Sequence, residues 1–271
     1  MHRFALAVPV LVASLGCGLS TVRCPSEGVE LRFAVDGDAS VAQALMTKRL
    51  QAAGQPCVTA TATATGVAVQ LADPAADSAR LTALLTAPGH LRLAANGAPA
   101  TYRALGEALS DAVPDDVSVR FDRDHLVVSA TDRAQVVALV GAAPAGHRVA
   151  YEPADPGWSV WLLQDAGALD DPEVLDVSLG DDTFGPSLAL RFGADDGARF
   201  ADLTRAQLNQ PLPLALDDEL LMAPVVRSPI EGGRLTITLG PTITEAEAKR
   251  VSALIAGAGL PPTRLEAEGV Y

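Results

Sequence analysis

The sequence predicts an α+β protein with antiparallel sheets, and its length allows about two domains. Three observations lead to this fold class. Hydrophobic residues make up 49% of the 271 residues, enough to fill packed cores. Segments in which apolar and polar residues alternate are followed by segments with apolar residues at helical spacing. Their order is β-α-β-β-α-β, the order of a ferredoxin-like unit with two helices on one face of a four-stranded sheet.

The first ferredoxin-like unit is expected over residues 29–95. Its first strand alternates as a half-buried strand does, and Gly54 and Pro56 end the helix that follows. The elements that we expect, in chain order, are a strand, a helix, two strands, a helix and a strand: Val29–Val35, Ala39–Ala53, Cys57–Thr65, Gly66–Ala72, Ala75–Ala87 and His90–Ala94.

A second, incomplete unit of the same kind is expected over residues 96–152. Its predicted elements are a helix, two strands that form a hairpin, a helix and a strand: Tyr102–Ala112, Val117–Phe121, His125–Ala130, Arg133–Val140 and His147–Tyr151. The next segment, Glu152–Gly157, contains two Pro and a Gly in six residues. Such a segment is typical of a linker, so we place the main domain boundary there.

The third unit is expected over residues 158–271, with several strands and two helices. Its second helix has the clearest start, because Thr244 and Glu247 have the spacing of a capping box. The predicted strands are Ser159–Gln164, Val174–Leu179, Leu188–Phe192, Pro211–Asp217, Leu220–Val226 and Arg234–Leu239. The predicted helices are Gly197–Leu208 and the segment from Thr244, which Gly257–Pro262 ends.

Residues 1–16 are typical of a signal peptide. A basic start precedes the apolar run Phe4–Gly16, which is too short to span a bilayer. Leu15 and Gly16 stand before Cys17 as in a bacterial lipobox, so we expect lipidation at Cys17 and a tether over residues 17–28. Gly18 after the cysteine favours the outer membrane. The alternative is cleavage by ordinary signal peptidase, which would leave a freely soluble periplasmic protein.

Cys24 and Cys57 remain as an even pair if Cys17 carries a lipid. Cysteines in an oxidising compartment form disulfides, and a Cys24–Cys57 bond would hold the N-terminal segment against the first unit. The alternative is one exposed and one buried thiol. The sequence leaves both alternatives open.

Charge argues against nucleic acid as a partner. There are 20 basic and 33 acidic side chains, which gives a net charge of −13. Binding to a duplex needs a cationic surface that displaces counterions from phosphates. An acidic protein instead stays dispersed in solvent. We therefore expect no nucleic acid partner, and contact with the membrane only through the N-terminal lipid anchor.

The sequence predicts no enzyme, no metal site and no cofactor. The four His are scattered, and the spacings of zinc proteases, serine hydrolases, P-loops and dinucleotide-binding folds are missing. Paired Asp residues occur near Gly, Pro and strand ends, where Asp builds turns and caps. Asp36 begins a segment that resembles a calcium loop, but Val41 and Thr47 stand where such a loop needs Gly and Glu.

Four blocks of the third unit follow the sequence patterns of one known family. Gly197–Thr204 is similar to the family pattern "GA-x-x-F-x-x-lT", and Pro213–Val226 is similar to "lAIvLDG-x-v-x-sAPvI". Ile230–Arg234 resembles its "I-x-G-G" turn. Thr242–Ala248 with Gly257–Pro261 resembles "ft-x-eeA" and the closing "aGaLP". These blocks resemble the P1 head of the SecD protein-export membrane subunit family. Upstream, Lys48–Gly54 and Gly66–Leu71 resemble the P1 base of the same family. Asp218 departs from the family, which usually has Gly there.

The resemblance implies a SecD P1-head-like α+β domain after the ferredoxin-like units, in a stand-alone protein that contains only the periplasmic P1 base and head. The family's transmembrane helices, which couple export to the proton gradient, have no counterpart in the sequence. We therefore expect a non-enzymatic accessory of the periplasmic side of the cell envelope, with unfolded or extended polypeptide as its partner in protein export. The alternative is a structural lipoprotein that docks another, folded envelope protein.

The segment Leu220, Leu221, Met222, Ala223 and Pro224 is the candidate for a polypeptide-binding edge. It is apolar and contains a Pro, and the edge of an antiparallel sheet captures an extended chain by adding a strand. The other interpretation, which the sequence favours, is a core strand with Pro at its edge.

Overall fold

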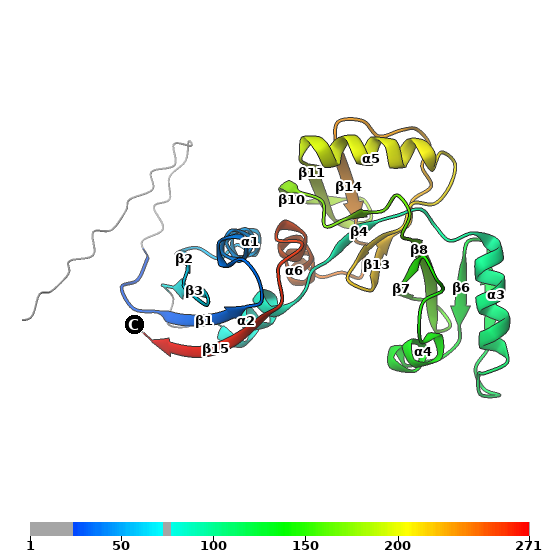
Figure 1. Cartoon of the computed structure of the whole chain (residues 1–271), viewed down its shortest axis with the longest axis horizontal. Coiled ribbons are helices and arrows are strands. Elements are labelled where there is room, and N and C mark those ends of the chain that lie inside the picture. The colour runs from blue at the N-terminus through cyan, green and yellow to red at the C-terminus, as the bar shows by residue number, and fades with distance from the viewer. Residues whose placement is uncertain (1–23, 73–76, 271) are drawn as a thin grey trace, which may run out of the picture.

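The computed structural model describes residues 24–72 and 77–270 and combines helices with three sheets of four, three and eight strands (Figure 1). The predicted α+β class is confirmed. In Figure 1 the four-stranded sheet lies at one end of the elongated chain, and α3 and α4 lie at the other end. We call the four-stranded sheet with α1 and α2 the base, and the remaining elements the head.

The base has the ferredoxin-like arrangement. Its elements are β1 (Val29–Val35), α1 (Ala39–Ala52), β2 (Val58–Ala62), β3 (Gly66–Leu71), α2 (Ser78–Thr86) and β15 (Thr263–Val270). The strand order is β15-β1-β3-β2, and every neighbouring pair is antiparallel. Buried side chains of α1 and α2 form one core with those of the strands, because the strands alternate and turn one apolar face toward both helices.

Local sequence signals begin both helices of the base. The carboxylate of Asp38 accepts hydrogen bonds from the backbone N–H groups of Ser40 and Val41 at the start of α1. Asp77 caps α2 in the same way through the N–H of Arg80. These bonds satisfy donors that a helix start leaves without a partner.

The strand that closes the base is not the one that the sequence predicts. His90–Ala94 was expected there, but β4 (Leu91–Leu93) belongs to the eight-stranded sheet. The fourth strand of the base is β15, which pairs with β1 from Val35↔Thr263 to Val29↔Val270. The burial of the two strands explains the difference. All three residues of β4 are buried, as suits a central strand, whereas β15 is mostly exposed, as suits an edge.

The eight-stranded sheet takes strands from all three units that the sequence predicts. Its strand order is β5-β6-β8-β7-β13-β12-β4-β9. The strands are β4, β5 (Val119–Asp122), β6 (His125–Val128), β7 (His147–Pro153), β8 (Trp158–Gln164), β9 (Leu169–Asp170), β12 (Leu214–Leu216) and β13 (Glu219–Met222). Two helices, α3 (Pro99–Ser110) and α4 (Arg133–Val140), pack on one face around the buried Tyr102 and Leu162.

The composition of Glu152–Gly157 predicted a linker between domains. This prediction is wrong, because the segment joins two paired strands of one sheet. It connects β7 to β8, which pair over seven positions from His147↔Gln164 to Pro153↔Trp158. Pro and Gly occur here because the chain reverses direction between paired strands. The same composition serves a linker and a turn, so the sequence alone did not distinguish them.

The three-stranded sheet completes the head. It consists of β10 (Val174–Asp182), β11 (Gly185–Phe192) and β14 (Arg234–Thr238), in the order β10-β11-β14. Two helices, α5 (Ala194–Ala206) and α6 (Glu245–Ala256), and the strands β4 and β12 contribute buried side chains to one core with this sheet. The predicted capping box at Thr244 and Glu247 begins α6, and both of its reciprocal bonds are present.

Arg49 joins the base to the head. Its side chain is fully buried on α1, and its guanidinium donates to backbone carbonyls instead of carboxylates. The bonds run to Leu84 (2.9 Å), Ala87 (2.5 Å), Pro88 (2.7 Å) and Gly257 (3.1 Å). These carbonyls lie where the chain leaves the base after α2 and where it returns after α6.

The guanidinium charge is stabilised by its surroundings. The carbonyls belong to the C-terminal ends of α2 and α6, which carry partial negative charge. Burial lowers the pKa of Arg49 to about 10, and the nearby carboxylates of Asp217 and Asp171 oppose this effect. Arg49 is therefore charged at neutral pH. Gly89 and Gly257 leave room for it, because a Cβ at either position would lie 2.5 Å from an Arg49 side-chain atom.

We predict that Arg49→Met lowers the free energy of unfolding by about 3–5 kcal/mol, because it leaves buried carbonyls without donors. Urea denaturation measures this change. The control is Arg32→Met on β1, where an exposed side chain pairs with Glu30 and the expected change is within about 0.5 kcal/mol. A loss below about 1 kcal/mol for Arg49→Met would contradict the assigned role.

Candidate functional site

The predicted edge Leu220–Pro224 begins in β13, the second strand of the β12–β13 hairpin. Leu214 pairs with Met222 and Leu216 pairs with Glu219, with a bulge between. The pairing continues beyond the strand, where the N–H of Leu212 donates to the carbonyl of Pro224 at 2.9 Å. One edge of the segment is thus bonded within the head and is closed to a ligand.

Burial divides the segment into an inner and an outer part. Leu220 is only 6% exposed and packs in a small core with Trp161, Leu163 and Ala215. Leu221, Met222 and Ala223 are half-buried, and Pro224 is exposed. The segment therefore has the burial of a core strand with Pro at its end. Its exposed part is Pro224 together with Val225, which is 41% exposed.

The second edge of β13 is paired only at its start. Glu219 pairs with Tyr151 of β7 in parallel, and the N–H of Tyr151 donates to the carbonyl of Asp218 at 2.9 Å. Two positions further along β7 lies Pro153, which has no N–H to continue the ladder. Within the described part of the chain, no strand pairs with Leu221 or Met222 on this side.

The hairpin turn before β13 contains Asp217 and Asp218. The residue with positive φ is Asp217, at +57°, so the strained position precedes the place where the family has Gly. The Asp217 carboxylate accepts from the N–H of His90 at 2.9 Å and of Gly89 at 3.3 Å. Asp218 pairs with Arg133 at 2.7 Å. The turn is thereby fastened to the segment that leaves the base.

The perturbed titratable groups of the head serve structural contacts. Tyr102 donates to the side chain of Asn96 and accepts from the N–H of Leu162, both at 2.7 Å, and burial raises the pKa of its hydroxyl. Burial also raises the pKa of the Glu152 carboxyl. None of these contacts pairs a nucleophile with a base.

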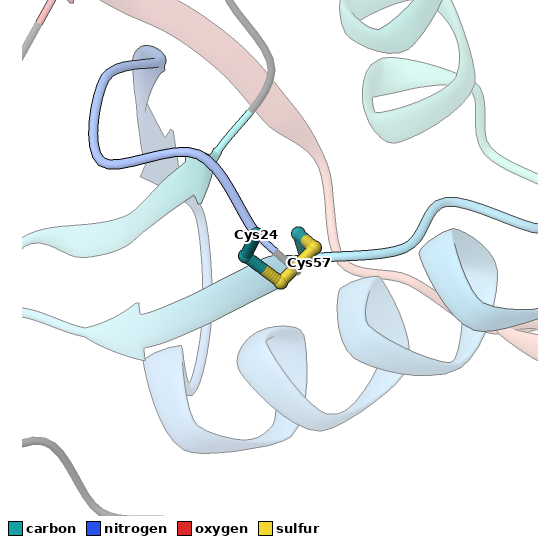
Figure 2. The surroundings of a disulfide bond; sticks show 2 residues. All are labelled: Cys24 and Cys57. Carbon is teal, nitrogen blue, oxygen red and sulfur yellow. A yellow bond between two sulfur atoms is a disulfide. The ribbon is translucent and has the colours of Figure 1, made fainter. Parts of the chain in front are cut away.

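The predicted cysteine pair lies at the edge of the base. Figure 2 shows the disulfide between Cys24 and Cys57, which are 33 positions apart in the sequence and 5.4 Å apart between Cα atoms. This is the first of the two alternatives that the sequence left open. The bond fastens the segment before β1 to the start of β2.

Three further expectations concern ligands and membranes. Residues 1–16 and Cys17, the predicted signal peptide and lipidation site, lie outside the described residues. Within residues 24–72 and 77–270, no three His, Cys, Asp or Glu side chains gather as metal ligands would. No helix in this part of the chain has both the length and the apolar character that a membrane span requires.

Comparison with known proteins finds a family resemblance for the second part of the head. Residues 148–261 match the family model described as "SecDF, P1 head subdomain". This part of the chain is therefore similar to the SecDF P1 head subdomain. The match covers β8 to α6, and with them the candidate edge on β13. The four sequence blocks that suggested the resemblance all lie within it or reach its end.

A curated relative supports the same assignment. The protein translocase subunit SecD of Acidaminococcus fermentans is 36% identical over 81 residues. The aligned part covers 30% of this chain and 19% of the relative. The chain thus spans about a fifth of the length of the subunit that it matches.

Solved structures extend the similarity of fold beyond the P1 head. The structure described as "Crystal structure of SecDF in Super-membrane-facing form" matches with a TM-score of 0.54 at 18% identity, over 90% of this chain and 30% of that one. Another, "Structure and function of a membrane component SecDF that enhances protein export", has a TM-score of 0.53 at 15% identity, over 88% of this chain and 98% of that one. The base and the head together therefore have the fold of a part of SecDF.

Proposed function

We propose that this chain is a non-enzymatic accessory of protein export that binds unfolded polypeptide through its P1 head. The observation that carries the proposal is the match of residues 148–261 to the SecDF P1 head subdomain. Its relative is named as a translocase subunit, and one SecDF structure is described as a component that enhances protein export. The assignment to export rests on these likenesses.

Binding of extended polypeptide suits the architecture of the head. Sheets bind an extended chain through backbone groups that lack a partner strand, and such groups occur where a ladder stops. On β13 the ladder with β7 stops at Pro153, beside Leu221 and Met222. We propose that the exposed residues Pro224 and Val225 mark where a bound polypeptide would enter this edge. Backbone bonds are independent of sequence, as a protein that handles many precursors requires.

We further propose that the protein acts on the periplasmic side of the cell envelope, held at the outer membrane by a lipid on Cys17. The sequence of residues 1–18 supports this location, because residues 1–16 are typical of a signal peptide and Gly18 follows Cys17. The check is metabolic labelling with palmitate. The wild type is expected to incorporate the label and Cys17→Ser to lose it. Equal labelling of the two proteins would show that Cys17 is not the lipidation site.

The polypeptide-binding proposal is tested with a photo-reactive amino acid at Pro224, using Leu220 as the buried control. The purified chain is mixed with one secretory protein in two forms, kept unfolded or allowed to fold. We expect crosslinks from position 224 to the unfolded form, and few from position 220.

Two outcomes would contradict this proposal. The first is that a labelled unfolded secretory protein, titrated with the chain and followed by anisotropy, shows no saturable binding. Stoichiometric capture of one folded envelope protein, without affinity for the unfolded form, would instead support a docking lipoprotein.

A further inference from the structure

Strand β5 is the terminal strand of the eight-stranded sheet and has an open edge. Its only strand partner in the described chain is β6, from Val119↔Val128 to Asp122↔His125. Just before it, the N–H of Ser129 donates to the carbonyl of Ser118 at 3.0 Å. Along an antiparallel strand, residues whose N–H and C=O groups bond to the neighbouring strand alternate with residues whose groups point away from it.

The alternation fixes which backbone groups are free. Ser118, Arg120 and Asp122 direct their N–H and C=O groups toward β6. Val119 and Phe121 therefore direct theirs outward, away from the sheet. Natural edges are commonly protected by Pro and by charged side chains, especially Lys. β5 contains no Pro or Lys, and its two charged side chains, Arg120 and Asp122, are bonded to each other. The edge is thus chemically ready to pair with another strand.

A groove runs between this edge and helix α3. Its volume is about 540 Å³, and its lining includes Tyr102, Arg103, Gly106, Glu107 and Phe121. The Phe121 side chain is 43% exposed, and its ring centroid lies 5.7 Å from that of Tyr102. An apolar side chain that entered the groove would therefore contact an aromatic surface beside the open backbone.

The surroundings of the groove are acidic. Between Pro99 and Val128 there are six acidic side chains (Glu107, Asp111, Asp115, Asp116, Asp122, Asp124) and three basic ones (Arg103, Arg120, Arg123), a net charge of −3. Glu107 and Asp111 line the groove, are exposed, and form no ion pair within the described residues. Arg120 is bonded to Asp122 at 3.1 Å. The local field favours a cationic ligand.

We propose that β5 and α3 bind an extended, cationic segment of unfolded polypeptide, which adds to the sheet as a strand. The inference rests on the proposed function and adds a binding surface outside β13. The bound strand would bond to the free backbone groups of Val119 and Phe121. Its apolar side chains would enter the groove, and its basic side chains would lie among the acidic ones. Pairing of two copies through β5 is opposed by their like charge.

The test uses a short fluorescent peptide of alternating valine and lysine, with anisotropy as the measurement. Val119→Pro removes an outward N–H and preserves the bonds to β6, since Pro is tolerated at such positions. The matched control is Ala62→Pro, at the outward edge of β2 in the base. We expect Val119→Pro to weaken binding about fivefold to tenfold and Ala62→Pro to leave it unchanged.

A second arm avoids the risk that a variant misfolds. The same peptide with N-methyl groups along one edge cannot donate to β5, and it should lose binding to the wild-type chain. A peptide of alternating valine and glutamate should bind at least about tenfold more weakly. Circular dichroism checks that both proline variants are folded.

The outcomes separate the inference from the proposed function. The Val119→Pro variant could bind the peptide as the wild type does, and the wild type could bind the N-methylated peptide equally well. If unfolded protein is still bound, these two results would overturn only the assignment to β5. If the wild type forms a dimer that Val119→Pro abolishes, the partner of β5 is a second copy of this chain, and the assignment to unfolded polypeptide is overturned. Failure of the wild type to bind any unfolded protein would overturn the proposed function itself.

Discussion

The buried guanidinium of Arg49 is the contact on which the arrangement of base and head depends. A charge taken out of water is stable only when its hydrogen-bonding capacity is satisfied. Arg49 meets this condition with carbonyls at Leu84, Ala87, Pro88 and Gly257. These carbonyls lie at the end of α2, where the chain passes from the base to the head, and at the end of α6, where it passes back. One side chain therefore holds both connecting segments. The head is therefore an insertion whose two ends are held together.

This insertion determines which strand edges are available to a partner. The base is completed by β15, whose pairing with β1 brings the end of the described chain beside its beginning. In the head, β13 is bonded on one side and partly paired on the other, whereas β5 ends its sheet. Open edges of this kind also invite pairing between copies, which neighbouring charged side chains oppose.

The sequence predicted the elements better than their partners. The capping box at Thr244 and Glu247 acts within a few residues, so local pattern was enough to place the start of α6. β15 was missed because its side chains are mainly polar and only Leu265 packs against the base core. Its partner β1 lies more than two hundred residues away. Arg49 was not predicted as buried, because its partners are backbone carbonyls, which no residue type reveals. Both interpretations of the candidate edge hold for part of it, because Pro224 is exposed and Leu220 is in the core.

Hydrogen exchange of the whole chain, with and without an unfolded secretory protein, tests most directly whether the head binds polypeptide through a strand edge. The outward N–H groups of Val119 and Phe121 have no partner strand within residues 24–72 and 77–270 and should exchange rapidly in the free protein. A bound polypeptide strand should slow them, while the four-stranded sheet of the base stays unchanged. Slowing that is confined to the base, or no slowing anywhere in the eight-stranded sheet, would contradict the account.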